Sequence, residues 1–278
     1  MGQLTQDLDD DCKLIKEESI MKKIWLTALD SSKENAQKFM TQMKPYGLQI
    51  DGHLWTDDLW KTAWFSSRED VIDPNNAVWA IMTSDKELQS PTNRYGISLL
   101  GMTLQARKGS GFPVVIIQTG GVPLSSDNLP TVLKGADVLL MSNPGLGAKL
   151  TAKVHAPVKP VLSEYRLDIC GNEHIGQWFE TGPQGSFWKG AIFGVCGAEI
   201  IFHAVGKKGE LPKTSQLNYP VKGMKIQLGE KEYVSWAVQN EIAADLSYYV
   251  KVDGFPEAIL FGAYPDEAEA DLYVINLK

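Results

Sequence analysis

Over residues 24–155, apolar positions alternate between short continuous runs and runs with helical spacing. Continuous runs are typical of strands buried on both faces, and they span 24–29, 77–82, 114–117 and 137–141. Residues 48–54 fit a second, less buried strand. Between the first two predicted strands, Ala36, Phe39 and Met43 recur at the spacing of one helix face. Strands that alternate with helices predict a mostly parallel sheet covered by helices on both faces.

Capping and stop signals place the helices between these strands. Ser31 with Glu34 fits a capping box at the start of the first helix, and Ser90 followed by Pro91 fits the start of another. Shorter helices are expected over 57–65 and 129–133, and a further one after Gly147. Right-handed crossovers leave few topologies for five such strands, and we take a flavodoxin-like strand order as the first choice.

The pattern changes after about residue 156, where Pro157 and Pro160 mark a boundary. Beyond it lie glycine-rich turns and short β-type runs at 191–195, 200–205, 224–228, 248–252, 258–262 and 272–277. Residues 234–246 fit either a helix or a strand. We therefore predict a flexible extension over 1–20, an α/β domain over 21–155 and a β-rich (α+β) domain over 156–278.

The first half of the chain resembles the flavodoxin-like superfamily that includes TIR-like domains and the nucleoside deoxyribosyltransferases. The resemblance rests on KKIWLTALDSS at the start, the strand VWAIMTSD, the spacing from Ser84 to Ser90 before a helix, and FPVVII as the next strand. It covers roughly residues 21–155 and is one of fold rather than of a catalytic signature. It implies a five-stranded parallel sheet with a ligand at the carboxyl ends of its strands.

The chain departs from the glycosidic enzymes of that superfamily at their catalytic position. Those enzymes carry a glutamate early in the helix after the third strand, where a carboxylate stabilises an oxocarbenium ion. Here Asn93, Arg94 and Tyr95 occupy that stretch, and a guanidinium repels a sugar cation. The departure favours a protein without this activity. An N-glycosidase-type enzyme remains the alternative, with Glu87 in the preceding loop, Asp85 or Asp30 as its acid.

Small polar residues follow four of the five strands. In a parallel sheet these segments meet at one edge, which we call the strand-end rim. It comprises Asp30, Ser31, Ser32, Thr83, Ser84, Asp85, Thr119, Gly120, Gly121, Ser142, Asn143 and Gly145. Backbone N–H groups at such turns bind phosphate or carboxylate groups, although ordinary caps and turns use the same residue types.

The composition of the chain argues against some classes of binding partner. A net charge of -7 argues against a general nucleic-acid binder, and no run reaches the ~18 apolar residues of a membrane span. Three cysteines are too few and too scattered for a disulfide framework, and the acidic N-terminal segment does not resemble a secretory signal. We therefore expect a cytoplasmic protein that binds neither nucleic acid nor membrane, and we expect no cofactor.

A zinc site is the one metal centre that the composition offers. Its candidate ligands are Cys170, His174, Cys196 and His203, but Cys196 lies in an apolar run and fits a buried small residue better. No metal is therefore expected. The leading interpretation is a non-catalytic signalling, sensing or assembly module that binds a small anionic or nucleotide-like ligand, or a protein partner, at the rim. A structural subunit that self-assembles as a homo-oligomer is the second alternative.

Overall fold

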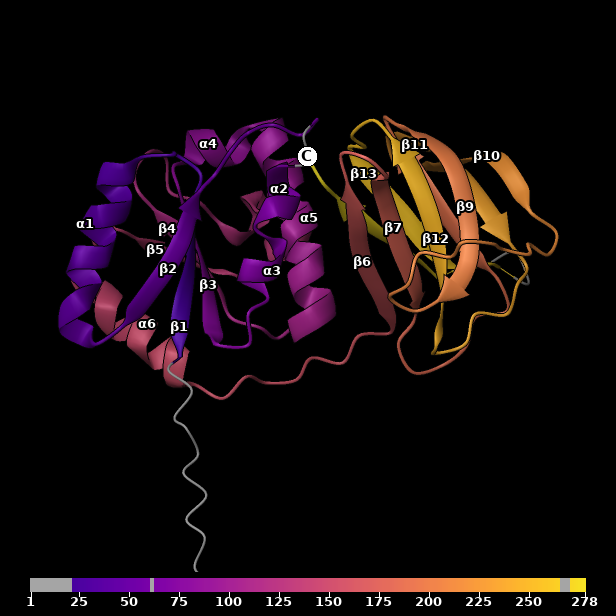
Figure 1. The fold of residues 1–278 in the computed structure, drawn as a ribbon. Helices are drawn as coiled ribbons and strands as arrows, with labels where there is room; N and C mark the ends of the chain where they lie inside the picture. The colour runs from indigo at the N-terminus through magenta and orange to yellow at the C-terminus, as the bar shows by residue number, and fades with distance from the viewer. Residues whose placement is uncertain (1–21, 61–62, 266–270) are drawn as a thin grey trace, which may run out of the picture.

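The computed structural model describes residues 22–60, 63–265 and 271–278. The extension expected over residues 1–20 lies outside these ranges. The chain forms an α/β region followed by a β-rich region, as the sequence predicts, and the two lie side by side (Figure 1). No helix in the described part of the chain has both the length and the apolar character that crossing a membrane requires.

Five parallel strands form the centre of the α/β region. In chain order the elements are β1 (Lys23–Ala28), α1 (Lys33–Met43), η1 (Lys44–Tyr46), β2 (Gln49–Leu54), α2 (Ala63–Ser66), α3 (Arg68–Val71), β3 (Asn76–Thr83), α4 (Asp85–Gln89), α5 (Pro91–Lys108), β4 (Val114–Gln118), η2 (Ser126–Asn128), η3 (Thr131–Leu133), β5 (Asp137–Leu140) and α6 (Leu146–His155). The strand order β2-β1-β3-β4-β5 is the flavodoxin-like order that the sequence predicted.

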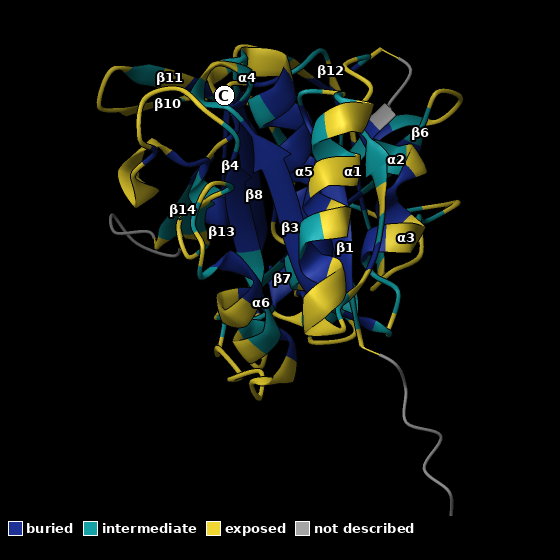
Figure 2. Ribbon diagram, turned by 90° about the vertical axis from the view of Figure 1, so that its left-hand side faces the viewer, coloured by how far each residue is buried: buried dark blue, intermediate teal, exposed yellow. Residues whose placement is uncertain are grey.

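Alternate residues of the strands pack against helices on opposite faces. Ile24 and Leu26 of β1 belong to a buried cluster with Phe39 of α1 and Leu150 of α6. The residue between them, Trp25, packs on the other face in a cluster that includes much of α5. Because both faces are covered, the central strands are almost entirely buried, whereas the outer face of α1 is open to solvent (Figure 2).

Three local expectations are corrected by the structure. Ser32, not Ser31, caps α1, because its side chain accepts a hydrogen bond from the backbone of Asn35. The segment before α5, expected to be a loop, contains the short helix α4. In place of one helix over 57–65, α2 begins at Ala63 and is followed by α3. These elements span only one turn, so helical periodicity could not reveal them.

The β-rich region consists of two antiparallel sheets. Its strands are β6 (Tyr165–Asn172), β7 (Gly176–Pro183), β8 (Ala191–Cys196), β9 (Glu199–Lys207), β10 (Val221–Leu228), β11 (Lys231–Val238), β12 (Leu246–Asp253), β13 (Ala258–Ala263) and β14 (Leu272–Asn276). The orders are β6-β7-β12-β9 and β10-β11-β8-β13-β14. In the ambiguous stretch 234–246, the first residues belong to β11, and the residues from 239 to 245 connect β11 to β12 without a helix. β6 and β7 were not anticipated.

The two antiparallel sheets pack face to face, and α5 joins them to the α/β region. The rings of Phe179 on β7 and Phe193 on β8 lie 5.2 Å apart, which places aromatic packing between the sheets. α5 contacts β6, the edge strand of the four-stranded sheet, and Ser98 of α5 donates a hydrogen bond to the carbonyl of Leu277. The helix therefore packs against the edge strand of one sheet and binds the residue that follows β14.

Candidate functional site

The parallel sheet brings the four segments of the strand-end rim to one edge. Backbone hydrogen bonds join their bases: Leu29 N to Met82 O at 2.8 Å, Thr119 N to Thr83 O at 2.9 Å, and Met141 N to Gln118 O at 2.9 Å. These bonds extend the strand pairing by one residue beyond the strands themselves. The rim is thus a continuous edge built from four turns.

In the first turn, polar side chains of the rim are used to start α1. The Asp30 carboxylate accepts hydrogen bonds from the Ser32 backbone at 3.0 Å and from the Asn35 side chain at 2.7 Å. The Ser31 hydroxyl donates to the carbonyl of Trp55 at 2.7 Å, and Ser31 adopts a φ of 50°. A non-glycine residue in the left-handed region costs conformational energy, which the Trp55 contact offsets.

The second turn contains a complete capping box. Ser84 is the N-cap of α4, and the Glu87 carboxylate accepts from the Ser84 backbone at 3.0 Å and also from its hydroxyl. Thr83 is buried, and its hydroxyl donates to the carbonyl of Ser84 at 2.9 Å. Glu87 therefore stands at the third position of the first helix after β3, not in a loop as the sequence suggested.

The side chain of Gln118 fixes the third turn through hydrogen bonds to its backbone. Its side-chain amide donates to the carbonyls of Gly120 and Val122 at 3.1 and 2.7 Å and accepts from the Leu124 backbone at 3.1 Å. Gly121 has a φ of +90°, and a Cβ there would lie 1.6 Å from a carboxylate oxygen of Asp85. The second and third turns are therefore in contact, and only glycine fits at this point.

In the fourth turn, the Asn143 side chain accepts from the Gly145 backbone at 2.8 Å, which fixes the start of α6. Ser142 is exposed at the turn itself. Gly120, Gly121, Ser31 and Ser142 are the exposed members of the rim, so its outer surface consists largely of backbone and hydroxyl groups. The three acids considered for catalysis, Asp30, Asp85 and Glu87, all contact neighbouring rim groups.

Residues 93–95, which the sequence suggested as the counterpart of the glutamate position in glycosidic enzymes, lie in the first turns of α5. Asn93 is buried there, and its amide donates to the carbonyl of Glu87 at 2.9 Å. Arg94 donates to the carbonyl of Asn128 at 2.8 Å, which ties α5 to η2. Tyr95 is fully buried. This stretch thus carries structural contacts among neighbouring elements.

The four cysteine and histidine candidates do not converge. Cys170 and His203 lie in the four-stranded sheet, Cys196 lies in the other sheet, and His174 is exposed in the turn between β6 and β7. Among the residues that the structure describes, no cluster of three or more His, Cys, Asp or Glu could hold a metal ion. Burial raises the pKa of the Cys170 thiol to about 12, which makes it a poor nucleophile.

Sequence reasoning missed a group of charges around the buried Asp168, between the two regions. Asp168 on β6 pairs with Arg68 of α3 at 3.4 Å and with Arg107 of α5 at 3.0 Å, and it accepts from the Thr103 hydroxyl at 3.2 Å. Desolvation raises the pKa of Asp168 in spite of the two guanidinium groups. A cleft of about 340 Å³ adjoins it, lined also by Glu180 and Lys208.

The group around Asp168 left no signal in the sequence. Its members come from α3, α5 and β6, which are far apart along the chain, and β6 itself was not expected. Every charged partner of Asp168 belongs to the α/β region, so the ion pairs serve the junction between the regions. We therefore interpret them as structural.

Comparisons with protein-family models and with curated proteins find no match to this chain.

Proposed function

We propose that this protein is a non-catalytic binding module, acting in signalling, sensing or assembly. The strand-end rim receives a small anionic or nucleotide-like ligand, or the surface of a protein partner. Turns at the carboxyl ends of parallel strands are the usual ligand position in open α/β sheets. Exposed backbone and hydroxyl groups at helix starts suit an anionic group.

One observation carries the preference for binding over catalysis: two of the three acids considered for catalysis, Asp30 and Glu87, already stabilise helix starts. The Glu87 carboxylate accepts two hydrogen bonds from Ser84, and the Asp30 carboxylate accepts two from the start of α1. A general acid or nucleophile must reach the substrate and exchange a proton or form a bond with it. Carboxylates engaged in this way stabilise helix starts instead.

A specific observation also favours the alternative, an enzyme that cleaves nucleosides or nucleotides. Glu87 lies in the first turn of the first helix after β3, which is where the resemblance to deoxyribosyltransferases and TIR-like domains puts a catalytic glutamate. In this alternative the capping box would open when substrate binds, and Glu87 would turn toward the sugar.

A ligand screen with one blocking variant distinguishes the two functions. A Cβ at Gly120 meets nothing within 4 Å, so Gly120→Phe projects a ring over the rim without displacing the fold. Gly185 has the same open surroundings in the β-rich region, and Gly185→Phe is the matched control. Nucleotides, NAD, nucleosides and sugar phosphates are tested by thermal shift, and every ligand that binds is then tested for turnover.

The binding module predicts a ligand that stabilises the wild type and the Gly185→Phe variant, does not stabilise Gly120→Phe, and is recovered unchanged. Turnover that disappears in Glu87→Gln would replace the proposal with the enzyme. Binding that survives in Gly120→Phe would move the site away from the rim. If no small ligand binds, the protein-partner form of the proposal predicts that Gly120→Phe abolishes self-association or capture of that partner.

A further inference from the structure

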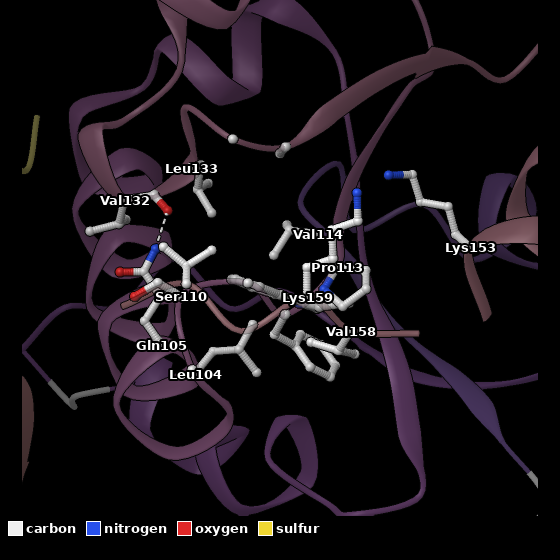
Figure 3. Close-up of a pocket in the computed structure, with 18 of the residues that line it drawn as sticks. Leu104, Gln105, Ser110, Pro113, Val114, Val132, Leu133, Lys153, Val158 and Lys159 are labelled. Atoms are coloured by element: carbon white, nitrogen blue, oxygen red, sulfur yellow. Dashed lines mark hydrogen bonds between the residues drawn. The ribbon is translucent and has the colours of Figure 1, made fainter. Parts of the chain in front are cut away.

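A cavity of about 480 Å³ lies at the other edge of the parallel sheet, beside the first residues of β4 and β5 (Figure 3). Most of the side chains that line it are apolar, among them Trp79, Leu104, Val114, Val132, Leu133 and Val158. The volume lies in the range of small-molecule pockets in proteins, which are largely apolar with a few polar groups.

The crossover from β4 to β5 contains little helix, and this leaves room for the cavity. It contains only the 3-10 turns η2 and η3, whereas the crossover from β3 to β4 contains the eighteen-residue α5. The Gln105 side chain of α5 donates to the carbonyl of Val132 at 2.7 Å and holds η3 beside the helix (Figure 3). Space therefore remains near the starts of β4 and β5 that a longer helix would fill.

The segment after α6 forms another wall of the cavity. Pro157, Val158 and Lys159 line the cavity on their way from α6 to β6. The contact with the opposite wall is close, because a Cβ at Gly111 would lie 2.0 Å from the carbonyl oxygen of Lys159. Glycine is thus required for this segment to lie against the loop before β4.

The charged side chains that line the cavity are basic. Lys153 and Lys159 are its charged lining residues, and none of the lining side chains among the described residues is acidic. Lys153 is paired with Asp137 at the start of β5. The Lys159 ammonium has no hydrogen bond or ion pair within the described residues, in a chain whose net charge is -7.

We propose that this cavity binds a small organic anion with an apolar body, such as a medium-chain carboxylate. The apolar chain is buried among the side chains of α5, η3 and β4, and the carboxylate pairs with Lys159 at the wall formed by the segment after α6. Burial of the chain supplies most of the affinity, and the single lysine selects an anion over a neutral molecule of the same shape. This site is independent of the strand-end rim, which lies at the opposite edge of the sheet.

Calorimetric titration with octanoate and octanol tests the proposal, because the two probes share a chain and differ in charge. Gly135 lines the cavity, and a Cβ there meets nothing within 4 Å, so Gly135→Phe places a ring at the cavity without a clash. Gly185→Phe, which lies outside both the cavity and the rim and has the same open surroundings, is its matched control. Lys159→Ala removes the anion partner, and Lys149→Ala, at an exposed position of α6 that does not line the cavity, is the control for charge.

We expect octanoate to bind about tenfold or more tightly than octanol, and Lys159→Ala to abolish that preference while Lys149→Ala retains it. Gly135→Phe should weaken the binding of octanoate by about tenfold, and Gly185→Phe should leave this binding unchanged. Equal binding of the two probes, an unaffected Gly135→Phe, or no heat at millimolar octanoate would overturn the proposal. None of these results bears on the rim, which is tested by Gly120→Phe with nucleotide-like ligands.

Discussion

His53 should make the protein less stable in mild acid. It lies on β2, where its Nδ1 accepts a hydrogen bond from the indole N–H of Trp25 at 3.2 Å, and its Nε2 is buried without a partner among the described residues. Burial lowers the pKa of His53 to about 4, against a smaller opposing effect of Asp70. Protonation would place a second N–H against the indole donor and would bury a charge.

The sign and the size of this pH effect follow from the linkage between protonation and folding. Because the pKa of His53 is lower in the fold than in the unfolded chain, its stabilising contribution is present above about pH 6.5 and is lost as the pH falls toward 4. With those two pKa values, the free energy of unfolding should fall by about 2 kcal/mol between about pH 8 and pH 5 from this residue alone.

Urea unfolding followed by tryptophan fluorescence measures this fall. His53→Phe keeps a ring but cannot titrate. At pH 8 it should be less stable than the wild type by about 1 kcal/mol, because the Trp25 indole loses its acceptor. Its decrease between the two pH values should be smaller than that of the wild type by about 2 kcal/mol. His174→Gln, in an exposed turn, is the matched control. A His53→Phe variant that loses as much stability as the wild type between the two pH values would refute this reasoning.

Three further predictions concern the capping box, the wall of the cavity and a buried thiol. Glu87→Ala should lower the free energy of unfolding by about 1 kcal/mol through loss of half of the capping box, as measured in urea; no change would mean that the carboxylate does not cap α4. Gly111→Ala should lower the free energy of unfolding by about 1–3 kcal/mol, because its methyl group would clash with the carbonyl of Lys159, whereas Gly135→Ala should leave the stability nearly unchanged. Equal melting temperatures of the two variants would contradict the close approach of Gly111 and Lys159. Cys170 should resist alkylation by iodoacetamide at neutral pH and react only on unfolding, since burial raises its pKa to about 12; rapid labelling of the folded protein, located by peptide mass spectrometry, would argue against that burial.

The parallel sheet could be predicted because its strands are buried on both faces and therefore appear as continuous apolar runs. The same rule failed for β6 and β7. The side chains of Asp168 and Glu180 interrupt their apolar pattern, although both are buried in the fold. Their burial depends on α3, α5 and neighbouring strands, and such tertiary contacts leave no trace in local periodicity.

The candidate site, too, could be predicted from the sequence only in part. The meeting of the four rim segments followed from strand direction alone. The capping role of Glu87 depended on a one-turn helix that periodicity cannot detect. The cavity near β4 and β5 was not foreseen, because it results from what the crossover lacks and from how the segment after α6 lies against Gly111.

The most direct test of the rim is a hydrogen-exchange measurement with and without the nucleotide-like ligand that gives the largest thermal shift. Our account predicts that added protection is confined to the four turns, at residues 29–33, 83–87, 119–122 and 141–146, and that the ligand is recovered unchanged. Protection elsewhere with none at these turns, or conversion of the ligand during the experiment, would contradict the claim that the rim is a binding site without catalysis.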